Sequence, residues 1–208
     1  MLKKDFFFKN HKINSNKFNK NLKKTKKAFL NLKFDIKNHK IPFLQSFKKD
    51  YFLDFSTLTI KKFSKYKNIV IIGMGGSVLG AKSIYNFFKE RIKKEVFFFD
   101  NLDENLYLEF KKIKNSCFII ISKSGETIEA ITNLNILLSN FSLKNKLVFI
   151  TEINKNNSMV NIANKLNAEI IEHKNFIGGR YSVLSEVGMF PAAIMGLNIK
   201  KFKMLEKL

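Results

Sequence analysis

Cysteine and long apolar runs are scarce in this sequence. Cys117 is the only cysteine among 208 residues, so the chain cannot form an internal disulfide. No apolar run approaches the roughly 20 residues needed to cross a bilayer. The basic start, Met1–Lys9, lacks both the apolar stretch of about 7–15 residues and the small-residue cleavage site of a secretory signal. We therefore expect a soluble cytoplasmic protein without a membrane partner.

Arginine is almost absent, although the formal net charge is +21: Arg91 and Arg180 are the only two arginines. Dense positive charge favours nucleic-acid binding, because lysine and arginine neutralise phosphates. Surfaces that contact bases or clamp phosphates usually favour arginine, however. Lysine, asparagine, isoleucine and phenylalanine are abundant together, which is typical of an AT-rich coding sequence. We therefore attribute the charge to solvated lysines and expect no nucleic-acid partner.

The first third of the chain differs from the rest. With 45% hydrophobic residues the chain can bury a core, and its length suggests one domain with an extension. Residues 1–66 are predicted to form a basic, mostly helical N-terminal extension, with a frayed or partly disordered lead-in around Asn10–Lys27. Pro42 should break any helix, and Asp50–Lys67 should hold another short one. Residues 67–208 are predicted to form the main domain.

Five short apolar runs follow, and each is continuous rather than alternating. They are Ile69–Ile72, Glu95–Phe99, Cys117–Ile121, Leu147–Ile150 and Ala168–Ile171. Continuous runs are typical of parallel strands buried on both faces. Between them lie four segments of helical length: Val78–Ile92, Glu104–Ile113, Thr127–Phe141 and Ser158–Leu166. This rhythm predicts an α/β fold with a doubly wound, parallel, five-stranded sheet of the flavodoxin-like kind.

Small and hydroxyl residues follow the first run, where ligands bind in such sheets. We call Gly73–Ser77 the glycine loop. Its glycines would let the backbone approach an anion, and Ser77 would lie near the start of the next helix. A nucleotide site is an alternative, with Asp100 as the ribose-binding acid, although Val78 stands where the fingerprint needs glycine. The loop could also be only a tight strand–helix connection.

The segment after the third run, Ser122–Thr127, is a stronger signal. This hydroxyl loop offers three hydroxyls, a lysine and a glycine within six residues. Together they could donate to all the oxygens of a phosphate monoester. An ordinary helix N-cap is the alternative, but a cap needs only one hydroxyl. The pattern favours phosphate binding.

A rare arginine follows paired glycines in Phe176–Ser182, just before an apolar helix predicted over Val183–Leu197. Because lysine cannot replace arginine where a planar fork meets oxygen atoms, Arg180 in a lysine-rich chain suggests a specific role. A structural arginine that caps strand ends is the alternative.

The three loops together resemble those of the glucose-6-phosphate isomerases. Gly73–Gly80 is similar to that family's glycine loop, and Ser122–Thr127 to its sugar-phosphate loop, with Glu129 where an acid is common. These two loops alone would indicate only the wider sugar-isomerase (SIS) fold. Ile177–Ser185, with Gly-Gly-Arg-Tyr-Ser, resembles the family's most diagnostic run. The resemblance covers roughly Asn68–Leu197.

This resemblance implies a reaction and a set of roles. Family members interconvert glucose 6-phosphate and fructose 6-phosphate, in glycolysis and gluconeogenesis, through a cis-enediol and without metal or organic cofactor. Arg180 would stabilise the developing enediolate oxygen, while Gly76 and Ser77 would lie beside the sugar. Four side chains of the hydroxyl loop would hold the phosphate: Ser122, Lys123, Ser124 and Thr127.

The departures from the family pattern concern catalysis. Glu186 stands where the family usually has a small residue. The family's general base is a glutamate well beyond the Gly-Gly-Arg run, and a histidine and a lysine follow in a second SIS domain. After Arg180 the only carboxylates are Glu186 and Glu206, and the histidines all precede it: His11, His39 and His173. We expect an isomerase that stops before its base, lacks the second SIS domain and is a homodimer when complete.

Two other functions stay open. A non-catalytic SIS-domain sugar-phosphate sensor, with a DNA-contacting N-terminal region, is the first alternative. Such a sensor has no need of Gly178–Ser182, and no helix-turn-helix pattern precedes Asp50. The second alternative is a bifunctional phosphoglucose/phosphomannose isomerase or another aldose–ketose isomerase.

Overall fold

The computed structural model describes residues 14–48, 50–102, 113–143, 145–153 and 157–202. By its internal contacts the chain divides into two compact units, Met1–Leu44 and Gln45–Leu208. The boundary predicted after residue 66 stays a prediction.

The described part of the first unit contains the helix α2 (Ser15–Lys37). The Asn14 side chain caps it by accepting hydrogen bonds from the N–H groups of Asn16 and Lys17, at 2.9 and 3.1 Å. The frayed lead-in that we predicted is therefore helical from Ser15 on. Good helix formers, mainly lysine and leucine, outweigh its polarity once the cap is in place. No residue of α2 is buried.

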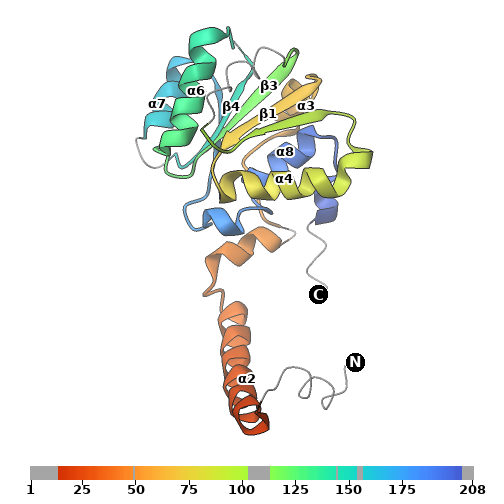
Figure 1. Cartoon of the computed structure of the whole chain (residues 1–208), viewed down its shortest axis with the longest axis vertical. Helices are drawn as coiled ribbons and strands as arrows, with labels where there is room; N and C mark the ends of the chain where they lie inside the picture. The colour runs from red at the N-terminus through yellow and green to blue at the C-terminus, as the bar shows by residue number, and fades with distance from the viewer. Residues whose placement is uncertain (1–13, 49, 103–112, 144, 154–156, 203–208) are drawn as a thin grey trace. The chain divides into compact units, whose positions relative to one another are not determined.

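The second unit contains the predicted sheet (Figure 1). Its strands are β1 (Asn68–Gly73), β2 (Glu95–Phe99), β3 (Ser116–Ile121), β4 (Leu147–Thr151) and β5 (Glu169–Glu172). All pairings are parallel, and the strand order is β2-β1-β3-β4-β5. This is the flavodoxin-like order, so the predicted fold class is confirmed. Each observed strand begins and ends within one residue of its predicted run.

Helices cover both faces of this sheet (Figure 1). One face packs against α3 (Thr57–Ser64), α4 (Gly76–Phe88) and α8 (Glu186–Ile194), and the other against α6 (Ile128–Asn140) and α7 (Ser158–Lys165). Ile69 and Ile71 contact the first layer, whereas Val70 and Ile72 contact the second. Both faces are therefore buried, as the continuous apolar runs predicted. The described residues also include three short 3₁₀ turns: η1 (Pro42–Phe47), η2 (Lys89–Arg91) and η3 (Gly179–Tyr181).

Residues before β1 contribute to the core of this unit. Phe63 of α3 is fully buried, and its ring lies edge-on to Phe190 of α8 at a centroid distance of 6.1 Å. Phe55 packs on the same ring at 5.3 Å. Aromatic pairs in this geometry stabilise a core by roughly 1 kcal/mol beyond the area that they bury. The segment from Gln45 to Tyr66 is thus part of the sheet unit by its contacts.

The remaining helices predicted from the sequence are Glu104–Ile113 and Val183–Leu197. Glu104–Ile113 lies outside the described residues, apart from Ile113. The helix predicted over Val183–Leu197 begins later, at Glu186, because Ser182–Ser185 forms a turn in which the Ser185 hydroxyl donates to the Ser182 carbonyl at 2.7 Å. It ends at Ile194, and Gly196 follows with a φ of +91°, as at many helix C-termini.

Candidate sugar-phosphate site

The loops singled out in the sequence gather at one edge of the sheet. The register pairs Gly73 with Ile121 and Ile121 with Ile150, so β1, β3 and β4 end level with one another. Thr151 pairs with Glu172, which brings the end of β5 to the same edge. The carboxyl edge of a doubly wound sheet is where ligands bind. The predicted site loops therefore share the position that a ligand site requires.

The glycine loop and the segment around Arg180 pack directly on each other. We call Lys174–Ser182 the arginine loop. A Cβ atom added to Gly76 would lie 2.3 Å from the Gly179 carbonyl carbon and 2.8 Å from the Arg180 nitrogen, so only glycine permits this approach. The Ser182 hydroxyl donates to the Gly179 carbonyl at 2.7 Å and lies 3.4 Å from that of Gly76.

This contact sets the start of α4 against Arg180. Ser77 lies half-buried in the first turn of α4, and Arg180 is exposed in η3. A small hollow of about 120 Å³ lies between the two loops, lined by Gly76, Leu79, Gly80, Gly179, Arg180 and Val183. The helix N-terminus and the guanidinium both favour negative charge at this point.

The hydroxyl loop is held by its own side chains. The buried Ser122 hydroxyl lies 2.7 Å from that of Thr127 and accepts from the Gly125 N–H at 3.1 Å. The Ser124 hydroxyl is exposed and accepts from the Glu126 N–H at 3.2 Å. Thr127 stands at the N-cap of α6, but its side chain makes no capping bond. The hydroxyls are therefore gathered together rather than used as an ordinary cap.

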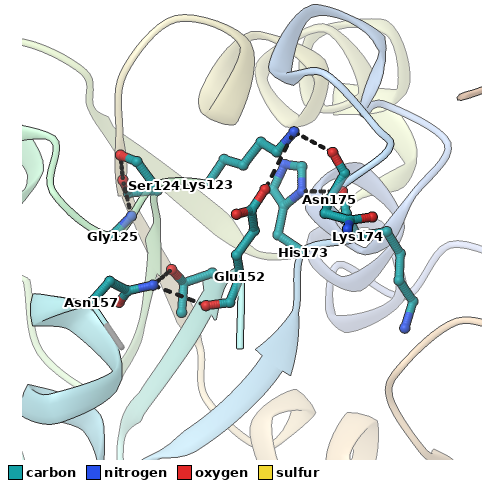
Figure 2. A network of polar contacts seen from close by, with 10 residues as sticks. Lys123, Ser124, Gly125, Glu152, Asn157, His173, Lys174 and Asn175 are labelled. Atoms are coloured by element: carbon teal, nitrogen blue, oxygen red, sulfur yellow. Dashed lines mark hydrogen bonds and ion pairs between the residues drawn. The ribbon is translucent and has the colours of Figure 1, made fainter. Parts of the chain in front are cut away.

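Two neighbours of this loop have structural tasks. The Glu126 carboxylate accepts from the Ser158 N–H at 2.6 Å and from its hydroxyl at 2.8 Å, and these bonds hold the pKa of Glu126 below its usual range. Gly125 has a φ of +72°, and a Cβ there would lie 2.1 Å from the Asn157 side chain. The Asn157 amide in turn donates to the Glu152 carbonyl at 2.9 Å (Figure 2). The loop is thus fixed against the start of α7.

The Lys123 side chain reaches sideways to the next two loops (Figure 2). Its ammonium donates to the Asn175 carbonyl at 2.7 Å and pairs with Glu152 Oε1 at 3.4 Å. His173 lies beside this pair with 1% of its surface exposed, and its Nδ1 is 3.2 Å from the Lys174 carbonyl oxygen. Burial lowers the pKa of His173, so that its ring is neutral at neutral pH.

The family model for phosphoglucose isomerase matches residues 45–207, which is most of the chain. The chain belongs to this family. The resemblance stated from the three loops is thereby confirmed. The match begins at Gln45, the first residue of the sheet-containing unit.

Curated relatives carry the name of the same enzyme. The glucose-6-phosphate isomerase of Methanocaldococcus jannaschii is 34% identical over 160 residues, which cover 74% of this chain and 39% of the relative. That of Campylobacter jejuni is 35% identical over 144 residues, which cover 64% of this chain and 35% of the relative. The chain thus spans little more than a third of these relatives.

Solved structures share the fold. A hypothetical protein from Thermus thermophilus has a TM-score of 0.63 at 24% identity, with 70% of this chain and 38% of that chain covered. An Escherichia coli protein has a TM-score of 0.56 at 21% identity, with 86% and 93% covered. At these identities the likeness supports the architecture alone.

Glu186, the departure from the family pattern, is accommodated by a polar cluster. Its carboxylate is fully buried and accepts from the Tyr51 hydroxyl at 2.9 Å and from the Asp54 N–H at 3.1 Å. Asp54 accepts from the Glu172 N–H at 2.6 Å, and Glu172 pairs with Lys174. We call these five residues the clasp. Burial raises the pKa of Glu186. Because its carboxylate oxygens accept hydrogen bonds from Tyr51 and Asp54, Glu186 is no candidate for a base at the carboxyl edge.

Sequence reasoning missed two residues of this region, Glu152 and His173. Each directly follows an observed strand, β4 or β5, and lies two residues after the run predicted for it. That position was the signal that could have found them. His173 was considered only as one of the three histidines that precede Arg180. The described part of the chain contains no group of three or more His, Cys, Asp or Glu side chains placed to hold a metal ion. None of its described helices is long and apolar enough to cross a membrane.

Proposed function

We propose that this chain is the sugar-phosphate-binding part of a glucose-6-phosphate isomerase. The observation that carries the proposal is the backbone contact of Gly76 with Gly179 and Arg180. It joins the Gly-Gly-Arg-Tyr-Ser run to the glycine loop at the edge where the hydroxyl loop also lies. The names of the curated relatives support the same assignment.

The phosphate of glucose 6-phosphate or fructose 6-phosphate is held by the hydroxyl loop. Ser124 is the exposed donor, and Ser122 and Thr127 form a hydroxyl pair behind it. Lys123 adds positive charge to the same loop. Hydroxyls and a cation within one short loop suit a dianionic phosphate, because charge-assisted hydrogen bonds are roughly twice as strong as neutral ones.

The sugar lies between the glycine loop and Arg180. Gly76 and Ser77 border it on one side, where the α4 N-terminus favours an oxygen with negative character. The Arg180 guanidinium stabilises the enediolate oxygen that forms when a proton moves between C1 and C2. Because this charge develops only towards the transition state, the contact accelerates the reaction rather than tightening ground-state binding.

The proton transfer needs an acceptor that can reach C1 and C2. Glu186 is committed to Tyr51 and Asp54. Since the chain spans little more than a third of its curated relatives, we assign the base to a second SIS-type domain. As the resemblance to the glucose-6-phosphate isomerases implies, the complete enzyme is a homodimer and works without metal or organic cofactor.

Calorimetric titration of the 208-residue chain with glucose 6-phosphate tests the binding function. Ser124→Ala and Thr127→Ala should each weaken affinity by roughly tenfold, since a hydrogen bond to a charged group contributes about 1.5–3 kcal/mol. Ser139→Ala is the matched control, because this exposed α6 hydroxyl donates only to the Asn135 carbonyl at 2.8 Å. Glucose without phosphate should not bind. Equal affinity in all variants would show that the hydroxyl loop is not the phosphate site.

A further inference from the structure

Lys123 makes contacts that a side chain serving only to bind phosphate would not need. Its ammonium lies between the Asn175 carbonyl, at 2.7 Å, and Glu152 Oε1, at 3.4 Å (Figure 2). The Glu152 side chain is only 7% exposed. A carboxylate buried to this degree requires a charged or hydrogen-bonded partner, and Lys123 supplies the positive charge.

These contacts join three successive loops of the carboxyl edge. Lys123 belongs to the hydroxyl loop after β3, Glu152 follows β4, and Asn175 belongs to the arginine loop after β5. The backbone also links the loops after β3 and β4, because the Glu152 N–H donates to the Lys123 carbonyl at 3.1 Å. The link from the hydroxyl loop to the arginine loop depends on the Lys123 side chain. Asn175 lies five residues before Arg180. It belongs to a short turn that is closed by the Ile177 N–H, which donates to the Lys174 carbonyl at 3.1 Å.

We infer that Lys123 is a positioning residue: with Glu152 and the Asn175 carbonyl it forms a loop brace that sets the arginine loop against the hydroxyl loop. The brace couples the phosphate end of the site to the Arg180 end. The expected effect of the brace on sugar-phosphate affinity rests on the proposed function. Its expected effect on the order of the arginine loop does not.

His173 supports the brace from one side. The charges of Lys123 and Glu152 both act on the buried His173 ring. The backbone N–H of His173 donates to the Thr151 carbonyl at 2.8 Å, which extends the β4–β5 pairing by one residue. The ring is neutral at neutral pH and adds no charge to the cluster. Among the described residues, Glu152 is the carboxylate that forms an ion pair with Lys123. Removing that charge therefore separates two possible roles for Lys123.

Glu152→Gln gives results of opposite sign for these roles. If Lys123 braces the loops, the substitution loosens the arginine loop and weakens affinity for glucose 6-phosphate about fivefold. If Lys123 only contributes charge to the phosphate and does not brace the loops, the substitution removes a competing carboxylate and tightens affinity. The measurement is calorimetric titration of the 208-residue chain with glucose 6-phosphate. Tighter binding by the variant overturns the proposal.

Hydrogen exchange tests the brace without any ligand. The Ile177 and Tyr181 amides, which donate to Lys174 and Gly178 carbonyls, should exchange about fivefold faster in both Glu152→Gln and Lys123→Met. Glu169→Gln is the matched control, because it breaks the Lys62–Glu169 ion pair of 2.9 Å at the other end of β5. It should change neither exchange nor affinity.

The two measurements separate the two proposals. If the unaltered chain fails to bind glucose 6-phosphate while exchange accelerates as expected, the proposed function fails and the brace stands. Unchanged exchange at Ile177 and Tyr181 in both brace variants overturns the brace, whatever the chain binds.

Discussion

Two polar networks meet at the end of β5, and they join different parts of the fold. On one side, His173 lies beside the loop brace, which connects the loops of the candidate site. On the other, Glu172 and Lys174 belong to the clasp, which connects Tyr51 and Asp54 to Glu186. Side chains alternate along an extended segment, and Figure 2 shows His173 and Lys174 pointing apart. Three consecutive residues thus serve both networks.

The networks differ in how fully their polar atoms are used. The buried Glu186 carboxylate has two protein donors, from residues 135 and 132 positions away in the sequence. In the other network the His173 Nε2 atom is buried and has no hydrogen-bond partner within the described residues. A fully bonded network rigidifies a fold, whereas an unsatisfied buried group costs stability and is typical of functional sites. The clasp should therefore govern stability, and the loop brace should govern ligand binding.

Breaking the clasp should produce the largest effect on stability. Glu186→Ala removes the acceptor for Tyr51 and Asp54 and leaves a cavity in the core, so the free energy of unfolding should fall by about 3 kcal/mol. Tyr51→Phe, which removes one donor, should lower it by about 1 kcal/mol. Urea denaturation of the 208-residue chain measures both. Glu90→Ala at an exposed position should change it by less than about 0.5 kcal/mol. A Glu186→Ala chain as stable as this control would contradict the role given to the clasp.

The two networks should also respond to pH with opposite sign. Burial lowers the pKa of His173 below 6.5, so the unfolded chain binds this proton first. Its stabilising contribution is complete above about pH 6.5 and is lost as pH falls through the folded-state pKa, by at most about 1.4 kcal/mol per pH unit. Burial raises the pKa of Glu186 above 4.5, so its contribution is present below that pH and is lost as pH rises through the folded-state pKa.

Paired variants separate these contributions. His173→Gln should remove the loss of stability below about pH 6.5, and Glu186→Gln should remove the opposing trend. Urea denaturation at several values between about pH 7 and pH 4 measures the slopes. His11 and His39 are present in the original chain and in both variants. The differences in the slope of stability against pH therefore report His173 and Glu186. Equal slopes in the original chain and in His173→Gln would contradict the assignment to His173.

The strands and the site loops could be predicted from the sequence because both depend on local patterns. A continuous β-branched run such as Ile69–Ile72 defines a buried strand by itself, and the residues that follow it lie at the carboxyl edge in any parallel sheet. The start of α8 was predicted too early because Val183 and Leu184 are apolar like the helix, although a serine turn holds them outside it.

The networks could not be predicted because they depend on which strands are neighbours. Lys123 reaches Glu152 and Asn175 only because β4 lies between β3 and β5, and apolar runs do not fix that lateral order. The pairing of Glu186 with Tyr51 spans 135 positions, and no local pattern links the two. In the sequence, Glu186 was noticeable only as a departure from the family pattern, and nothing there indicated its partners.

The smallest effect is expected from Lys174, and it gives the sharpest contrast with Lys123. Lys174 pairs with Glu172 at the rim of the clasp, where its side chain is 21% exposed. Lys174→Met should lower the free energy of unfolding by only about 0.5 kcal/mol, because a partly exposed ion pair is screened by solvent. It should leave affinity for glucose 6-phosphate unchanged, whereas Lys123→Met should weaken it.

Both variants remove one positive charge and keep a side chain of similar length, so a general effect of net charge on anion binding would appear equally in the two. Titration with glucose 6-phosphate at two salt concentrations distinguishes the cases, since a long-range charge effect weakens with salt. Equal losses of affinity that both diminish with salt would mean that Lys123 acts only through its charge. If only Lys123→Met loses affinity, the loop brace on one side of His173 supports ligand binding, and the clasp on the other side supports stability.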